Sequence, residues 1–407
     1  MPRSKDHLKE RAKKVLERGE AGEIDLKGYD YGEPGEEEVK PEELPEKLLR
    51  RAEEVGIDLG SVSGGTYLQI DHNVAYTMVT DYLKKQGVLI MSTLEALERL
   101  EWVKEYYWKA MPVDTDKFTA MTELNLRHGY FIYVPAGVKI DRPIQACLMM
   151  RTKRIAQPVH NIIIVDKGAD ITLVTGCAAM VNEGLHIGVS EFYVKEGARV
   201  NFIMIHGWAP DFNVRPRTAV IVESEGTFTS YYVNLYPVRN LQMEPRVYLH
   251  AKARGYLTSI LLGKGDSTMD VGGRLEFVGR GSRGEIISRS IITDQATVIM
   301  RGRLIGRATE VRGHLECRGL LLSPSARSKA IPELEAVTEG AELTHEAAIG
   351  RISEEELNYL MARGFTEEEA TSLIVRGFLD VGLDKMPRRL QASLRSILDT
   401  VAKLSKG

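Results

Sequence analysis

The chain has 407 residues, with 54 Lys and Arg against 57 Asp and Glu, which gives a formal net charge of −3. A charge this close to neutral offers no electrostatic case for binding nucleic acid, and no apolar run approaches the roughly 18 residues that span a bilayer. The N-terminus has no apolar core of the kind found in secretory signals, so we expect a cytoplasmic protein.

The first part of the chain, residues 1–124, is predicted to be a helical and mixed region. Asp6–Glu20 carries Glu and Lys at helical spacing. Farther on, the runs "TYLQID" and "GVLIM" are typical of strands. Ser92–Met111 indicates one helix, with Ser92 as its N-cap and Glu95 as the partner in a capping box.

Residues 125–350 repeat a short β-rich run, two or three turn residues, a glycine and another β-rich run. Glycines fall at Gly137, Gly168, Gly197 and Gly226, so their numbers advance in steps of 31, 29 and 29. A period near 29 with no helical segment between the strands is typical of a solenoid and argues against βαβ units. The sequence therefore predicts a mainly β core, a parallel β-helix with one coil per repeat.

Residues 351–407 are predicted to form a C-terminal helical domain. Ser353–Glu356 and Thr366–Glu369 match capping boxes, and Gly364 and Gly377 follow the two predicted helices as stops. Pro387 suits the first turn of a third helix. A tail of this size is too small for a catalytic domain, and it can cap the solenoid, bind a partner, or do both.

The repeat length also indicates which residues stack on neighbouring coils. The step from Cys147 to Cys177 is 30 and the step from Cys177 to His206 is 29, so these three residues are candidates for a ladder. Cysteine is among the most frequently buried residue types, and burial in the solenoid core is the simpler interpretation. Three cysteines are too few for a disulfide framework in a reducing compartment.

The third cysteine, Cys317, is followed by His345 at a step of 28 and by Glu346 at a step of 29. One coil would then bring a thiol beside an imidazole or a carboxylate, a ligand mixture that suits iron, zinc or a sulfur-bearing site. Only one of His345 and Glu346 can point the same way as Cys317 on a regular strand. The pattern favours a site completed by a second protomer, and a buried thiol beside a surface acid is the alternative.

The segment Glu316–Phe378 resembles the C-terminal signature of the SufB/SufD family, the β-helical components of the Suf machinery for iron–sulfur cluster assembly. This resemblance implies a right-handed parallel β-helix between an N-terminal helical region and a C-terminal helical domain. It also implies that family members pair through their last coils and that the C-terminal helices dock SufC, an ATPase of the ABC type. Further matching segments are Gly65–Asp71, Gly87–Met91, Gly129–Val138, Val174–Ala179 and Gly279–Arg289.

The resemblance extends to single residues. Cys317 matches the SufB cysteine implicated as cluster ligand and sulfur acceptor, and Glu346 matches the glutamate proposed as its co-ligand. His345 occupies the place of the essential interface histidine of SufD. Cys177, within "TGC", resembles the SufB cysteine proposed to receive sulfur and pass it along the β-helix interior. Cys147 and His206 match no motif and are expected to be core residues.

SufB and SufD usually divide these residues between them, whereas this chain carries Cys317, His345 and Glu346 together. We therefore expect a non-enzymatic scaffold that forms a homodimer and builds a transient iron–sulfur cluster at the protomer interface. It has no phosphate-binding glycine loop of its own, so ATP binding is expected in SufC. A reduced flavin is reported for some assemblies of the family, but this sequence has no flavin motif, and it does not indicate the sulfur donor.

Three alternatives to this expectation remain. The chain could be a SufD-like adaptor without its own cluster, or it could pair with a SufB or SufD paralogue instead of itself. It could also be a β-helix enzyme that cleaves polysaccharides, although it has neither an export signal nor acidic residues on aligned coils.

Overall fold

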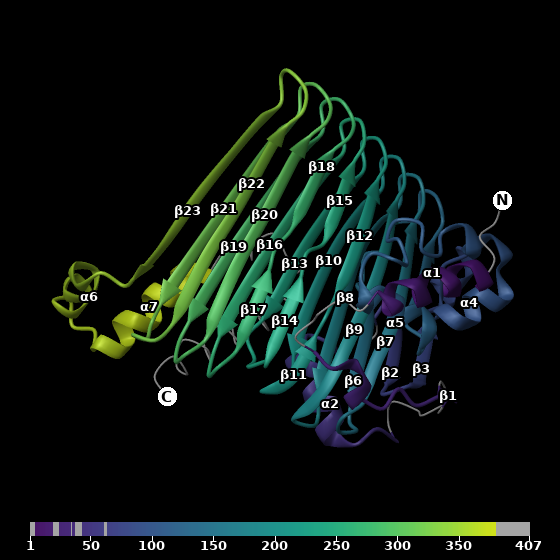
Figure 1. Ribbon diagram of the computed structural model, residues 1–407, viewed down its shortest axis with the longest axis horizontal. Helices are drawn as coiled ribbons and strands as arrows, with labels where there is room; N and C mark the ends of the chain where they lie inside the picture. The colour runs from purple at the N-terminus through teal and green to yellow at the C-terminus, as the bar shows by residue number, and fades with distance from the viewer. Residues whose placement is uncertain (1–4, 19–23, 34, 37–42, 61–62, 380–407) are drawn as a thin grey trace.

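The fold is a parallel β-helix with helices at both ends, as Figure 1 shows, in a computed structural model that describes residues 5–18, 24–33, 35–36, 43–60 and 63–379. The prediction of a mainly β solenoid flanked by helices is confirmed. Within the described residues, no helix is both long and apolar enough to cross a membrane.

Two walls of strands face each other across the core. In the described residues the first wall has 11 strands and the second has 12. Neighbouring coils pair in parallel, and only the two pairings at the N-terminal end, β2 with β3 and β4 with β5, are antiparallel. In spatial order the first wall consists of β1 (Gly35–Glu36), β3 (Asn73–Val79), β2 (Gly65–Ile70), β6 (Ile144–Met150), β8 (Asp170–Ala179), β10 (Arg199–Gly207), β13 (Thr227–Asn234), β16 (Arg254–Gly263), β19 (Arg283–Ile292), β21 (Arg312–Leu321) and β23 (Glu342–Arg351).

The second wall is divided along its middle. In its middle coils, two short strands separated by a bend take the place of one long strand. At one end of this stretch the long strand β9 pairs with both β11 and β12, and at the other end β20 pairs with both β17 and β18. Its strands are β4 (Leu89–Ser92), β5 (Tyr130–Val134), β7 (Ala156–Val165), β9 (Glu183–Val194), β11 (Asp211–Val214), β12 (Arg217–Val222), β14 (Asn240–Met243), β15 (Arg246–Leu249), β17 (Thr268–Val271), β18 (Arg274–Phe277), β20 (Thr297–Gly306) and β22 (Arg327–Ala336).

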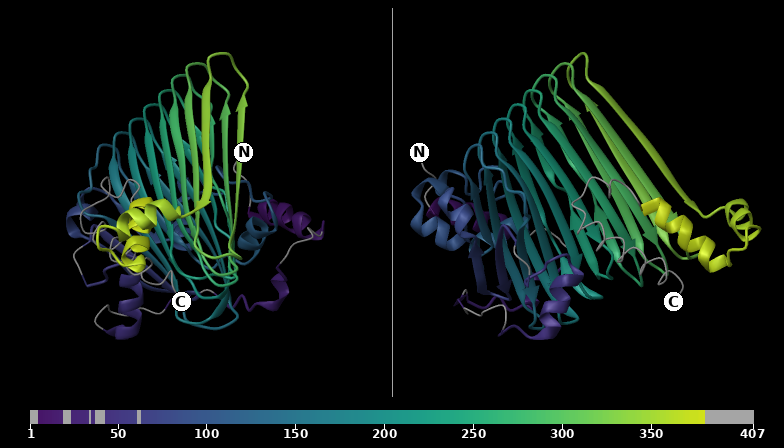
Figure 2. Two further views of the ribbon diagram at one scale, coloured as in Figure 1. Left: turned by 90° about the vertical axis from the view of Figure 1, so that its left-hand side faces the viewer. Right: turned by 180° about the vertical axis from the view of Figure 1, so that it is seen from behind.

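The helices cover the outer faces of the walls. α1, α4, η3 and α5 pack on the second wall near its N-terminal end, whereas α2 and α7 lie on the first wall, as the right-hand view of Figure 2 shows. Their bounds are α1 (Lys5–Glu17), η1 (Leu26–Gly28), α2 (Glu46–Glu54), α3 (Asp81–Lys85), α4 (Thr93–Arg99), η3 (Glu101–Glu105), α5 (Lys117–Leu124), α6 (Glu354–Met361) and α7 (Glu367–Leu379).

The repeating glycines mark the turns between coils. Gly137, Gly168 and Gly197 have φ values of 73°, 66° and 66°, and a side chain added there would meet nothing within 4 Å. The backbone conformation therefore explains these glycines, because residues with a Cβ rarely adopt positive φ. Inside the coils, the inward side chains form one apolar core that runs from Tyr67 to Ala326.

Several predicted details were wrong. The helix expected over Ser92–Met111 ends at Arg99, and the chain continues as the short 3₁₀ helix η3. Ser92 does cap α4, because its hydroxyl accepts a hydrogen bond from Glu95 N at 3.1 Å. Gly377 lies within α7 and does not end it, whereas Gly364 follows α6 with a φ of 96°.

The predicted limits of the three regions stay predictions. Four described strands of the walls, β1, β2, β3 and β4, precede residue 125, so the sheets extend into the expected N-terminal region. The predicted third helix from Pro387 lies outside the described residues.

Candidate functional site

Cys177 and His206 are neighbours inside the β-helix. Cys177 in β8 pairs with His206 in β10, and both side chains are buried. Cys147 does not join this ladder, because it pairs with Gly176, the residue just before Cys177. A slip of one residue turns a side chain to the other face of a sheet.

Cys147 instead points to the outer face of the first wall. It is fully buried there in an apolar cluster that includes Leu48 of α2 and Ile57. Burial raises the pKa of Cys147 to about 12. Its expected role as a core residue is therefore confirmed.

The interior around Cys177 keeps its groups uncharged. Burial raises the pKa of the Cys177 thiol well above its usual value, and the nearby Cys147 thiol adds to this effect. Burial also lowers the pKa of His206 well below its usual value, with a further contribution from His186. His206 Nδ1 lies 2.9 Å from the hydroxyl of Tyr232.

Cys317 lies near the C-terminal end of the solenoid, on the inner face of β21. It pairs with Ser288 on one side and Ala347 on the other. Burial raises the pKa of Cys317 to about 11, although the Arg289 guanidinium and a hydrogen bond with Ser288 act in the opposite direction. A thiol with this pKa is protonated at neutral pH.

Neither His345 nor Glu346 lies directly opposite Cys317. The register places His345 opposite Leu315 and Glu346 opposite Glu316. His345 therefore shares the inward face with Cys317 but is displaced by two residues, whereas Glu346 belongs to the outward face. Within the described chain, no three His, Cys, Asp or Glu side chains lie close enough together to hold a metal ion.

The outward face beside Cys317 carries a strip of charges. Glu316 accepts hydrogen bonds from Arg289 at 2.5 Å and pairs with Arg318 at 2.6 Å. Arg318 also lies 3.8 Å from Glu346, whose side chain is 65 % exposed. Spacing could have found part of this set, since Arg289 and Arg318 are one coil apart.

One inward position carries polar side chains from the middle of the solenoid to Cys317. In consecutive strands it holds Tyr232, Ser259, Ser288 and Cys317. Ser259 donates a hydrogen bond to Ser288 at 3.0 Å, and Tyr232 contacts His206. A buried polar line thus connects the surroundings of His206 with Cys317 through a largely apolar core.

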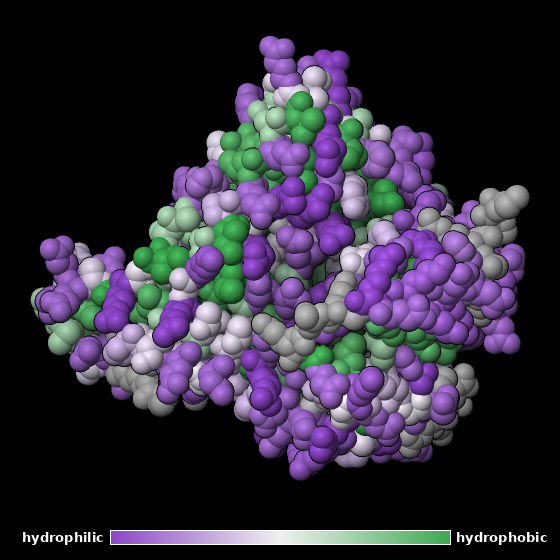
Figure 3. All heavy atoms as spheres, viewed as in Figure 1, coloured by the Kyte–Doolittle hydropathy of each residue, from purple (hydrophilic) through white to green (hydrophobic). Residues whose placement is uncertain are grey.

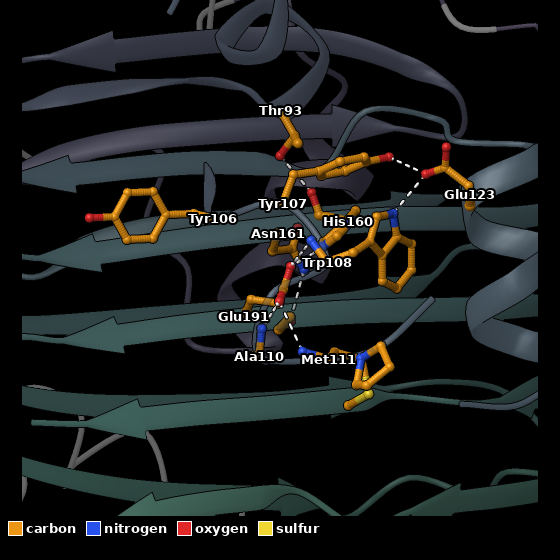
Figure 4. Close-up of polar contacts among 12 residues, drawn as sticks. Thr93, Tyr106, Tyr107, Trp108, Ala110, Met111, Glu123, His160, Asn161 and Glu191 are labelled. Carbon is orange, nitrogen blue, oxygen red and sulfur yellow. Dashed lines mark hydrogen bonds and ion pairs between the residues drawn. The ribbon is translucent and has the colours of Figure 1, made fainter. Parts of the chain in front are cut away.

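A second buried polar group holds the N-terminal region on the second wall, as Figure 4 shows. The carboxylate of Glu191 in β9 accepts hydrogen bonds from the backbone N–H groups of Trp108, Ala110 and Met111 at 2.6–2.9 Å. His160 Nε2 lies 2.8 Å from the same carboxylate. These contacts hold the last part of the predicted helix, Trp108–Met111, in a non-helical turn, because its N–H groups bond to Glu191. A charged residue within the apolar run "EFYV" was the available signal.

Comparison with known proteins shows to which family this chain belongs. A family model described as the SufBD core domain of SUF system FeS cluster assembly matches residues 148–378, and one for the SufBD protein N-terminal region matches residues 55–146. The chain belongs to the SufBD family.

Curated relatives of this SufBD chain cover nearly its whole length. An iron–sulfur cluster assembly SufBD family protein of Methanothermobacter thermautotrophicus is 40 % identical over 97 % of this chain and 98 % of its own length. One from Archaeoglobus fulgidus is 44 % identical over 86 % of this chain and 94 % of its own. A third, from Pyrococcus horikoshii, is 32 % identical over 88 % and 81 %. The chain is thus an iron–sulfur cluster assembly protein of this family.

Proposed function

We propose that this SufBD protein is a scaffold on which a nascent iron–sulfur cluster is assembled at the interface of two protomers, with Cys317 as the central ligand and final sulfur acceptor. The observation that carries the proposal is the position of Cys317, one strand from the end of the first wall and on the inner face. His345 shares that face, and Glu346 lies on the adjoining outer face. Two chains would provide two copies of each group, and few thiolates suit a cluster that must later leave.

Sulfur is proposed to enter at Cys177 and reach Cys317 along the interior. Cys177 and Cys317 lie five strands apart in the first wall, which corresponds to about 24 Å at the usual strand spacing. A persulfide on Cys177 cannot reach Cys317 directly over that distance. The buried line of Tyr232, Ser259 and Ser288 supplies polar groups along the way, as passage of a polar sulfur species would require.

The last coil is suited to pairing with a second copy. In the described residues, β22 pairs only with β20 and β23 only with β21, so each strand keeps one free edge. Free edges invite pairing with another chain. Leu334, Val337 and Ile349 are 38 %, 54 % and 40 % exposed there, and Figure 3 shows apolar side chains among the polar ones over the strands at this end. Light scattering should therefore give the mass of a dimer, and a monomer would argue against a homodimeric scaffold.

The C-terminal helices are the proposed docking site for SufC, which would supply ATP hydrolysis. α6, α7 and their connection expose Tyr359, Phe365 and Leu373 at 57 %, 41 % and 46 %. Aromatic side chains of this kind commonly dominate binding at protein interfaces. The double substitution Tyr359→Ala and Phe365→Ala should weaken co-purification with SufC. Substitution of Tyr82 in α3, which is even more exposed, by Ala should leave it unchanged.

The deciding experiment is anaerobic reconstitution with iron and sulfide, with and without SufC, followed by visible absorption and Mössbauer spectra. The wild type should hold a cluster, and Cys317→Ala should lose it. Cys147→Ala is the matched control, because that thiol is equally buried but faces outward under α2. If neither the wild type nor the variants hold iron, the protein is better described as a SufD-like adaptor.

A further inference from the structure

Cys177 and His206 share a small internal cavity. The cavity measures about 10 Å³, and all of its lining residues are buried, among them Tyr130, Thr175 and His186. A space of this size is at the lower limit of what accommodates one water molecule. It is therefore large enough for a single added atom next to the Cys177 sulfur, and too small for an organic ligand.

His206 lines this cavity and has one ring nitrogen without a hydrogen-bond partner. Nδ1 contacts the Tyr232 hydroxyl at 2.9 Å, while Nε2 is fully buried and has no hydrogen-bond partner. Tyr232 has no other hydrogen-bond partner described for its hydroxyl. If Nδ1 carried the proton, the buried hydroxyl hydrogen and the Nε2 lone pair would both lack partners.

The alternative tautomer leaves fewer groups unsatisfied. When Tyr232 donates to Nδ1, the phenol hydrogen is satisfied and only the Nε2–H of His206 is left over. Since each unsatisfied buried polar group costs free energy, this tautomer is the favoured one. His206 then has one buried N–H donor without a partner, beside a cavity that it shares with its strand neighbour Cys177.

We propose that this cavity is a sulfane-sulfur site, in which the terminal sulfur of a persulfide on Cys177 accepts a hydrogen bond from His206 Nε2–H. This inference rests on the proposed sulfur-acceptor role of Cys177 and assigns the group that holds the transferred atom. His206 is thus a positioning residue and does not itself exchange sulfur. The donor belongs to the class of persulfides, whether carried by a protein or by a small thiol.

The transfer is balanced without an added oxidant or reductant. Cys177 loses its proton, and its sulfur attacks the outer sulfur of the donor persulfide. An S–S bond forms to Cys177 as the S–S bond of the donor breaks, and the donor leaves as a thiolate that takes up the released proton. The new persulfide keeps its proton in the buried cavity, and its terminal sulfur accepts the hydrogen bond from His206.

The test uses the full-length protein under anaerobic conditions with cysteine persulfide as the sulfur donor. Mass spectrometry of the alkylated peptides measures the fraction of Cys177 that carries an extra sulfur. His206→Leu removes the donor and should lower persulfide retention about 2- to 10-fold, the effect of losing a hydrogen bond between neutral groups. His206→Gln keeps an N–H in the cavity and should restore most of the retention.

Two controls separate positioning from packing. His186→Leu removes a similar volume from the same cavity, but its Nδ1 is bonded to Gln157 at 3.0 Å, so retention should stay near the wild-type value. The pH at which the Cys177 persulfide is half alkylated should rise in His206→Leu and not in His186→Leu. Tyr130, the other titratable group that lines the cavity, and Tyr232, which contacts His206, are unchanged in both variants.

The outcomes distinguish the inference from the function on which it rests. If the wild type gains sulfur at Cys177 and His206→Leu retains it equally well, the His206 assignment is wrong while the acceptor role stands. If the wild type gains sulfur at Cys317 but never at Cys177, both the assignment and the acceptor role of Cys177 are overturned. Should His206→Leu fail to fold, Tyr232→Phe tests the same assignment. This substitution removes the donor to Nδ1, so the Nε2 proton of His206 is free to move to Nδ1. Unchanged retention of the Cys177 persulfide would then contradict the proposed tautomer.

Discussion

The substitution Glu191→Gln should destabilise the protein by about 3–5 kcal/mol, because the new amide group cannot accept the hydrogen bonds that the carboxylate oxygen accepts now. Glu191 Oε2 faces Trp108 N at 2.7 Å and His160 Nε2 at 2.8 Å. If the NH₂ group replaces this oxygen, the buried N–H of Trp108 meets another donor. The bonds from Ala110 N and Met111 N to Oε1 survive but lose the charge of their acceptor.

The assay for this prediction is urea unfolding followed by tryptophan fluorescence, since Trp108 belongs to the affected contact. Glu196→Gln is the matched control: its ion pair with Lys167 at 3.1 Å is about half exposed, so its loss should cost less than about 1 kcal/mol. The region around Lys109 should also become more sensitive to trypsin in Glu191→Gln. An unfolding free energy within about 0.5 kcal/mol of the wild type would refute the view that Glu191 fastens the N-terminal region to the β-helix.

Three further predictions concern the first wall and the last coil. Arg51 of α2 donates hydrogen bonds to the carbonyls of Gly207 and Ala179 at 2.5 and 3.1 Å, so Arg51→Ala should loosen α2 and speed alkylation of Cys147 roughly tenfold. Arg50 is an exposed neighbour, and Arg50→Ala should leave the alkylation rate unchanged. Equal rates in both variants would show that Arg51 does not hold α2 on the first wall. Burial raises the folded-state pKa of Cys147 from 9.0 to about 12. The contribution of this thiol to stability is therefore intact below pH 9 and is lost as pH rises towards 12, by about 1.4 kcal/mol per pH unit. The urea midpoint should fall less between pH 9 and pH 10 in Cys147→Ala than in the wild type, and equal declines would contradict the raised pKa of Cys147. Because His345 and not Glu346 shares the inward face with Cys317, His345→Ala should lower iron retention at least tenfold and more than Glu346→Ala; the reverse order in iron analysis would place the site on the outer face.

The sequence was informative where a local rule decides the outcome. Turn glycines such as Gly168 recur at the coil period because the backbone needs positive φ there, so the period alone predicted the solenoid. Capping boxes gave the starts of α6 and α7, since Ser353 and Thr366 accept hydrogen bonds from the third residue of each helix. The pair Cys177 and His206 was also accessible, because its spacing in the sequence equals the true register between β8 and β10.

The spacing in the sequence failed to predict which residues pair where neighbouring coils differ in length by a single residue. Cys147 pairs with Gly176 between β6 and β8, whereas Cys317 pairs with Ala347 between β21 and β23, so the second register is one residue longer than the first. These small differences turn Cys147 away from Cys177 and place Ala347 opposite Cys317. Spacing in the sequence does not contain this information, because the length of each turn is set by how the corners pack.

The sequence by itself determined the solenoid, its flanking helices and the residues able to carry sulfur and iron, because these follow from turn geometry, capping and side-chain chemistry. Only the tertiary structure decided which way those residues face and what lies beside them. The donor that His206 directs at Cys177 depends on its contact with Tyr232 in the next strand. The turn of the chain from Trp108 to Met111 likewise depends on Glu191, which lies far along the chain in β9. Both depend on neighbours brought together by coiling, and local sequence does not encode them.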